Sequence, residues 1–121
     1  MILDLHHIQI AIPNDQEETA HAFYVDVLGF SEVLKPNALL GRGCIWLEAG
    51  HVQLHLGVED PFTPAKKAHP GFRVNSLENT IMHLATKGIA YRIDIDLPNI
   101  KRVYIDDPYG NRIELLEITT N

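Results

Sequence analysis

The chain of 121 residues carries 16 acidic and 10 basic side chains, which give it a formal net charge of −6. This length suits one domain, and hydrophobic residues make up 45% of the composition, a usual share for a globular protein. The negative charge argues against binding to nucleic acid, whose phosphates require a basic surface.

The sequence also points to a compartment. Cys44 is the only cysteine, so no disulfide can form within the chain, which is typical of proteins in a reducing environment. The N-terminal residues lack the basic start and the small-residue cleavage site of a secretory signal. No apolar run approaches the roughly 20 residues that cross a bilayer. We therefore expect a cytoplasmic protein that does not bind membranes.

The first half of the chain shows one strand, one helix and three more strands. Isoleucines alternate with other residues over residues 6–12, and this period of two predicts a half-buried strand. Asp15 followed by Glu18 predicts the N-terminus of a helix, and Gly29 stands where a helix would end. Short strands are then expected over residues 30–35, 43–49 and 51–57.

After a linker of residues 58–68, which contains two prolines, the same order of elements returns. Residues 69–74 are predicted to form a strand, and Ser76 is expected to cap a helix that closes at Gly88. Strands are predicted over residues 89–94, 101–106 and 111–119.

The two halves correspond in position as well as in type. His69 follows His7 by 62 residues (69 − 7), Gly88 follows Gly29 by 59 (88 − 29), and Glu114 follows Gln53 by 61 (114 − 53). Near-constant spacing at three separate elements indicates an internal duplication. We interpret the chain as an α+β protein with one domain over residues 1–121. Its βαβββ modules are residues 1–57 and 69–121.

Because side chains alternate along a strand, the apolar residues of each strand are expected to face the helices and the polar residues the opposite side. That opposite face collects seven polar side chains, namely His7, Gln9, Gln53, His55, His69, Arg73 and Glu114. A solvated sheet face is polar too, but it usually carries lysine, glutamate, threonine and serine. Two histidines and a carboxylate are a common ligand set for Fe(II), Mn, Ni or Zn. The face therefore predicts a metal site, with a plain polar surface as the alternative.

Other residues on these strands are candidates for contact with a substrate. Arg73 is suited to holding a carboxylate or phosphate with two hydrogen bonds, although a surface salt bridge is an equal alternative. His55 and Gln9 are expected to orient ligands or substrate, or only to bind water. Trp46 and Tyr104 occupy equivalent places in the two halves and are expected to wall the cavity, unless they belong to the core.

Two segments resemble a known superfamily. The opening HHIQIAIPNDQEETAHAFYVDVLGF and the ending RVYIDDPYGNRIELLE are similar to those of vicinal oxygen chelate proteins, the glyoxalase, bleomycin resistance protein and dioxygenase group. The resemblance covers essentially the whole chain. It implies the glyoxalase-like fold, in which two βαβββ modules form cupped mixed sheets with helices on the outer face.

The resemblance also implies a site and a chemistry. Metal positions in the superfamily lie in the first and last strand of each module, and here they match His7, Gln53, His69 and Glu114. A divalent ion (Zn, Ni, Co, Mn or Fe(II)) would hold adjacent substrate oxygens, as in lyases, isomerases and dioxygenases, with Glu114 taking direct part in catalysis. Isomerases also need a base, for which Glu48 and Asp106 are candidates. The alternative is a metal-free binding protein of the bleomycin resistance type.

The sheets also predict an assembly. Two short open sheets expose edges, and proteins commonly cover such edges by dimerising. We expect a homodimer, with exchange of modules between the two chains as one alternative. Its expected partner is a small-molecule substrate or ligand.

Overall fold

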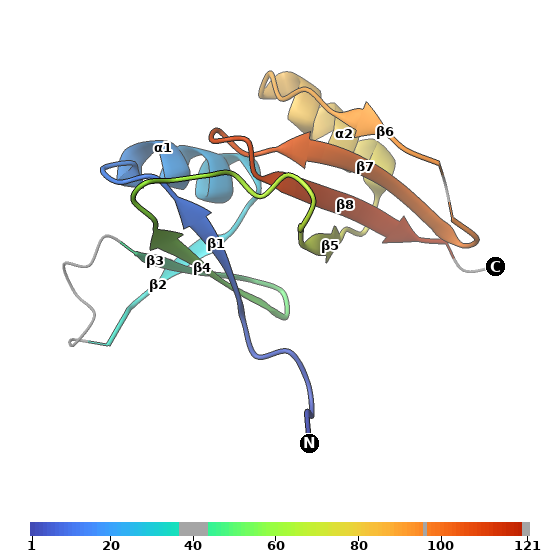
Figure 1. Ribbon diagram of the computed structural model, residues 1–121. Coiled ribbons are helices and arrows are strands. Elements are labelled where there is room, and N and C mark those ends of the chain that lie inside the picture. The colour runs from blue at the N-terminus through green and yellow to red at the C-terminus, as the bar shows by residue number, and fades with distance from the viewer. Residues whose placement is uncertain (37–43, 96, 120–121) are drawn as a thin grey trace. The chain divides into compact units, whose positions relative to one another are not determined.

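The computed structural model describes residues 1–36, 44–95 and 97–119, and it contains two compact units, Met1–Pro64 and Ala65–Asn121 (Figure 1). Each unit begins with a strand, continues through a helical segment and ends with three strands. The predicted α+β class and the two βαβββ modules are therefore confirmed. The division between the units falls inside the linker expected over residues 58–68.

The first unit is a four-stranded mixed sheet with one helical segment. Its elements are β1 (Ile8–Ile12), α1 (Glu17–His21), η1 (Ala22–Val27), β2 (Ser31–Val33), β3 (Ile45–Ala49) and β4 (Val52–Val58). The strand order is β1-β4-β3-β2, with β1 parallel to β4 and the other pairs antiparallel. Ile12, Leu54 and Leu56 are fully buried, as the predicted apolar face of these strands requires. Gly43, where β3 was expected to start, lies outside the described residues.

The start of the first helix differs from the prediction. Asp15 is not the N-cap, because its φ of 57° places it in the left-handed region rather than the extended one that a cap needs. The N-cap is Gln16, which makes no capping hydrogen bond with its side chain. The helix then widens into the π-helix η1, where the Leu28 N–H donates to the Phe23 carbonyl at 3.0 Å.

The second unit repeats the arrangement. Its elements are β5 (Gly71–Arg73), α2 (Leu77–Thr86), β6 (Arg92–Ile93), β7 (Ile100–Asp106) and β8 (Arg112–Ile118). The order β5-β8-β7-β6 matches that of the first sheet, again with one parallel pair, β5 and β8. Ser76 caps α2 as predicted, since its Oγ accepts from the Asn79 N–H at 3.1 Å. Gly88, at the end of this helix, has the positive φ expected of a glycine that closes a helix.

A buried polar turn joins β7 to β8. The Asp107 carboxylate accepts hydrogen bonds from the backbone N–H groups of Tyr109 and Asn111, at 3.0 and 2.8 Å, and from the Asn111 side chain at 2.8 Å. The Asn111 side-chain oxygen accepts from the Ala65 N–H at 2.9 Å. Since Ala65 begins the segment that carries His69, this turn helps to set where that histidine lies.

None of the helices within the described residues is long and apolar enough to span a membrane.

Candidate functional site

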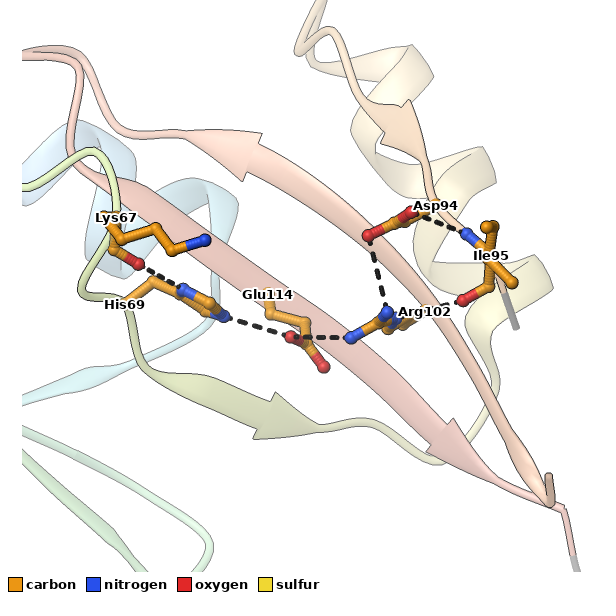
Figure 2. A network of polar contacts seen from close by, with 6 residues as sticks. All are labelled: Lys67, His69, Asp94, Ile95, Arg102 and Glu114. Carbon is orange, nitrogen blue, oxygen red and sulfur yellow. Dashed lines mark hydrogen bonds and ion pairs between the residues drawn. The ribbon is translucent and has the colours of Figure 1, made fainter. Parts of the chain in front are cut away.

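The second unit contains a close histidine–carboxylate pair. His69 Nε2 lies 3.1 Å from Glu114 Oε1, and His69 Nδ1 lies 2.9 Å from the Lys67 carbonyl oxygen (Figure 2). A carbonyl oxygen only accepts, so Nδ1 carries a hydrogen. The other ring nitrogen, Nε2, faces a carboxylate oxygen of Glu114. This contact is favourable when a proton or a cation lies between Nε2 and Oε1. Two ligands about 2.1 Å from one metal ion, at angles of about 90–110°, are separated by about 3.0–3.4 Å.

Glu114 is buried in the middle of the second sheet. Its side chain comes from β8, where it lies opposite Gly71 in β5 and Tyr104 in β7. Only 9% of the residue is exposed, which is unusual for a glutamate and requires partners for its charge. His69 is one such partner. The second is Arg102, whose Nη1 lies 3.7 Å from the same oxygen.

Sequence reasoning missed Arg102. Its Nε donates to the Ile95 carbonyl at 3.3 Å, and its Nη2 lies 3.4 Å from the Asp94 carboxylate, so the guanidinium is held on both sides (Figure 2). The period of two could have found it, because Arg102 and Tyr104 are two residues apart on β7 and share a face with Glu114. The arginine holds the carboxylate against His69.

Tyr104 lies among cationic and aromatic groups. The guanidinium carbons of Arg102 and Arg112 lie 5.7 and 5.1 Å from the centre of its ring, and the His69 ring meets it edge-on at 5.3 Å. The structure thus places the predicted substrate residue Tyr104 beside the histidine–carboxylate pair. Arg73 lies further along the sheet, exposed on β5 and opposite Leu116.

The first unit carries a stack of three aromatic rings. Trp46 in β3 stacks on His55 in β4 with ring centres 4.2 Å apart and planes 3° apart. His55 in turn stacks on His7, just before β1, at 4.3 Å and 21°. Burial, with His7 and His6 nearby, lowers the pKa of His55. His55 is therefore neutral at neutral pH, which is the form of imidazole that binds metal ions.

Gln9 and Gln53 lie on the same face of the first sheet as this stack. Gln9 is opposite His55, and its amide occupies the space above Gly57, where an added Cβ would lie 2.7 Å from Nε2. Gln53 is exposed and lies opposite Glu48 in the ladder between β3 and β4. Glu48, one of the two candidate bases, is thus a neighbour of an expected metal position.

Asp106, the other candidate base, is already paired. Its two carboxylate oxygens accept from Arg92 Nη1 and Nη2 at 2.9 and 3.1 Å. Such a two-bond pair with arginine occupies the oxygens that would accept a substrate proton. Glu48 is therefore the better candidate.

The four expected metal positions divide two and two between the units. In the second unit, His69 and Glu114 are in contact. In the first unit, the His7 ring stacks on His55, and the described residues show no hydrogen bond between His7 and Gln53. Within either unit, the described part of the chain holds no group of three or more His, Cys, Asp or Glu side chains placed to bind one metal ion.

Comparisons with known proteins agree with this architecture. The chain is similar over 98% of its length to a glyoxalase family protein from Bacillus anthracis, with 40% identity, 98% of that chain covered and a TM-score of 0.94. A glyoxalase family protein from Enterococcus faecalis is 28% identical over 94% of this chain and 97% of its own, with a TM-score of 0.71. A glyoxalase/dioxygenase from Nostoc punctiforme, 19% identical, shares the fold with a TM-score of 0.78 over 97% of this chain and 92% of its own.

No curated protein gives a significant match. The family model named Glyoxalase/Bleomycin resistance protein/Dioxygenase superfamily matches residues 4–115, which is nearly the whole chain and includes the pair of His69 and Glu114. The chain belongs to the glyoxalase/bleomycin resistance protein/dioxygenase superfamily.

Proposed function

We propose that this protein is a divalent-metal-dependent enzyme that acts on a small oxygenated metabolite, as a lyase, isomerase or dioxygenase. The observation that carries the proposal is the contact of 3.1 Å between His69 Nε2 and Glu114 Oε1, at a buried carboxylate. The Nδ1–H of the same ring is directed to the Lys67 carbonyl. Histidines that bind metal ions commonly donate their second N–H in this way.

The residues present suit a divalent ion. The resemblance to the superfamily implies that the side chains that would hold it are His7, Gln53, His69 and Glu114. When bound, the ion supplies Lewis acidity toward the oxygens of the substrate. Imidazole nitrogens with one carboxylate are typical of sites for Zn, Ni, Co, Mn or Fe(II).

The chain's own residues prepare the site. The Lys67 carbonyl fixes the tautomer of His69, and Arg102 orients the Glu114 carboxylate. Glu48 is proposed as the base that takes a proton from the substrate. Its side chain is exposed and, unlike that of Asp106, forms no ion pair with an arginine among the described residues. Tyr104 and Trp46 are proposed to flank the substrate, and Arg73 to bind an anionic group on it.

The test is the metal content of the protein after purification without chelators. Elemental analysis should find close to one equivalent of a divalent transition metal per chain, or find it after reconstitution with Ni, Co, Mn, Zn or Fe(II). Less than about a tenth of an equivalent, unrestored by any of these ions, would reject the enzyme proposal. It would leave the alternative, a binding protein that holds its ligand beside the rings of Trp46 and His55.

We also propose that the protein works as a homodimer in the cytoplasm. Supporting the dimer, the N-terminal Ile2 and Leu3 are 90% and 95% exposed, and Ile93 on the two-residue strand β6 is 76% exposed. Exposed apolar side chains that lie close together are commonly covered by a partner chain. Sedimentation equilibrium should give a mass near twice 13.6 kDa at micromolar concentration, and a monomer there would contradict the proposal.

A further inference from the structure

The second sheet ends at a strand with an open edge. β6 is the last strand in the order β5-β8-β7-β6, and β7 is the only strand beside it among the residues that the structure describes (Figure 1). In their ladder Arg92 lies opposite Tyr104, and Ile93 lies opposite Val103. The other side of β6 is an edge to which a further strand can add through backbone hydrogen bonds.

The polar side chains of this edge are held on one face of the sheet. Arg92 donates two hydrogen bonds to Asp106, at 2.9 and 3.1 Å, and the Asp94 carboxylate lies 3.4 Å from Arg102 Nη2 (Figure 2). Asp106 and Arg102 each stand two residues from Tyr104 on β7, so all three share a face. Arg92 and Asp94 are therefore both directed to the face of Tyr104.

The alternate side chains of the edge are apolar and exposed. Ile93 is 76% exposed, Ile95 is 80% exposed and Tyr91 is 38% exposed. Ile93 shares the face of Val103, and alternation places Tyr91 and Ile95 on that face too. Open edges in soluble proteins are usually protected by charged side chains, whereas here the two charged side chains are paired within the sheet. The apolar row beside β6 thus has the character of a surface that a partner covers.

The segment of residues 91–95 is complementary to itself. When two copies meet antiparallel about a two-fold axis at Ile93, the two Ile93 side chains face each other, Arg92 faces Asp94, and Tyr91 faces Ile95. Opposite charges directly across a ladder attract, and like charges repel. An axis at Arg92 would oppose two arginines, and an axis at Asp94 would oppose two aspartates. Of these three centres, only Ile93 keeps like charges apart.

The ion pairs already present in each sheet continue this pattern of charges. Across the junction the order would be Asp106 and Arg92 of one copy, then Asp94 and Arg102 of the other, so the sign alternates from each charged group to the next. β2, which holds the corresponding place in the first sheet, lacks this property. An axis at its middle residue, Glu32, would bring two glutamates face to face.

We propose that residues 91–95 of two copies of this chain pair antiparallel about Ile93 and join their second sheets into one continuous sheet. This inference rests on the proposed homodimer and specifies the surface through which it forms. The ladder would end near Ile95, whose N–H already donates to the Asp94 carboxylate at 2.7 Å. The arrangement requires no exchange of modules between the chains.

The test exploits the fact that residue 93 would face its own copy. Ile93→Glu and Ile93→Lys should each weaken dimerisation by at least about 100-fold in sedimentation velocity, because like charges placed face to face in an interface are strongly unfavourable. An equimolar mixture of the two variants should dimerise again, since a carboxylate then faces an ammonium group. With one variant labelled with ¹⁵N, native mass spectrometry should find one chain of each kind in the restored dimers. Mixing would not rescue variants that had merely lost their fold.

Leu34→Glu is the matched control, because Leu34 is an apolar residue of the first unit that is 94% exposed. It should dimerise like the wild type. An Ile93→Glu variant that still dimerises, a mixture that stays monomeric, or loss of the dimer in Ile2→Glu instead would overturn this surface while leaving the homodimer in place. A monomeric wild type would reject the surface and the proposed homodimer together.

Hydrogen exchange of the wild type provides a measurement that needs no variant. The backbone amides of residues 91–95 should exchange more slowly at concentrations where the dimer forms than at concentrations where it dissociates, because pairing covers this edge. The amides of α2 should exchange alike at both concentrations. Equal exchange of residues 91–95 in dimer and monomer would overturn the proposal.

Discussion

Replacing His69 by alanine is expected to weaken the binding of a divalent metal ion by at least about 100-fold, while the free energy of unfolding falls by less than about 1 kcal/mol. The large loss of affinity follows because His69 supplies a nitrogen whose tautomer is already fixed by the Lys67 carbonyl. The small loss of stability follows because the side chain is 25% exposed, and ion pairs near the surface contribute about 0–1 kcal/mol. Arg102 remains beside Glu114 in the variant.

Calorimetric titration with Zn²⁺ and urea unfolding monitored by circular dichroism measure the two quantities on the same preparations. His51→Ala is the matched control, because His51 is an exposed histidine in the turn between β3 and β4. It should change neither quantity appreciably. A His69→Ala variant that binds Zn²⁺ like the wild type, or that loses several kcal/mol of stability, would show that the histidine serves the fold rather than a metal ion.

The largest effect on stability is expected at the turn between β7 and β8. Asn111 is 2% exposed and bridges the Ala65 N–H, at 2.9 Å, to the Asp107 carboxylate, at 2.8 Å. Alanine at this position leaves the part-buried Ala65 N–H without its acceptor and removes one donor from the buried Asp107 carboxylate. Each unsatisfied buried group costs about 1–3 kcal/mol, so Asn111→Ala should lower the free energy of unfolding by about 3 kcal/mol.

Asn79→Ala provides the comparison, because Asn79 is exposed on α2 and only its backbone takes part in the cap. Alanine there should change the stability by less than about 0.5 kcal/mol. Urea unfolding of both variants decides the matter. A loss below about 1 kcal/mol in Asn111→Ala would mean that water replaces the lost hydrogen bonds and that the turn is not what fixes Ala65.

Much of the fold could be predicted because the strands of each core, such as β1, β3, β4 and β8, bury apolar side chains. The isoleucines of β1 and the leucines of β4 recur at every second residue, and burial of Ile12, Leu54 and Leu56 follows directly. The cap at Ser76 is a local interaction between neighbouring residues and was predicted correctly. The cap at Asp15 was not, because backbone conformation decides whether a side chain can reach the helix, and the residue letters do not reveal that conformation.

Part of the candidate site, the contact within the second unit, could be predicted from the sequence. Alternation along β8 placed Glu114 on the polar face, where the structure brings it to His69. The partner of Trp46, by contrast, depends on the length of the turn before the last strand, and counting residues cannot reveal strand register. Arg102 escaped notice because its role depends on three partners that are distant in sequence or belong to the backbone.

Anomalous diffraction from crystals soaked with Co²⁺ shows whether the pair of His69 and Glu114 binds a metal ion. We expect one strong anomalous peak per chain, about 2.0–2.2 Å from both His69 Nε2 and Glu114 Oε1. Loaded crystals with no peak between these two atoms, or with ions only at other surface histidines such as His21 beside Glu32, would contradict this expectation.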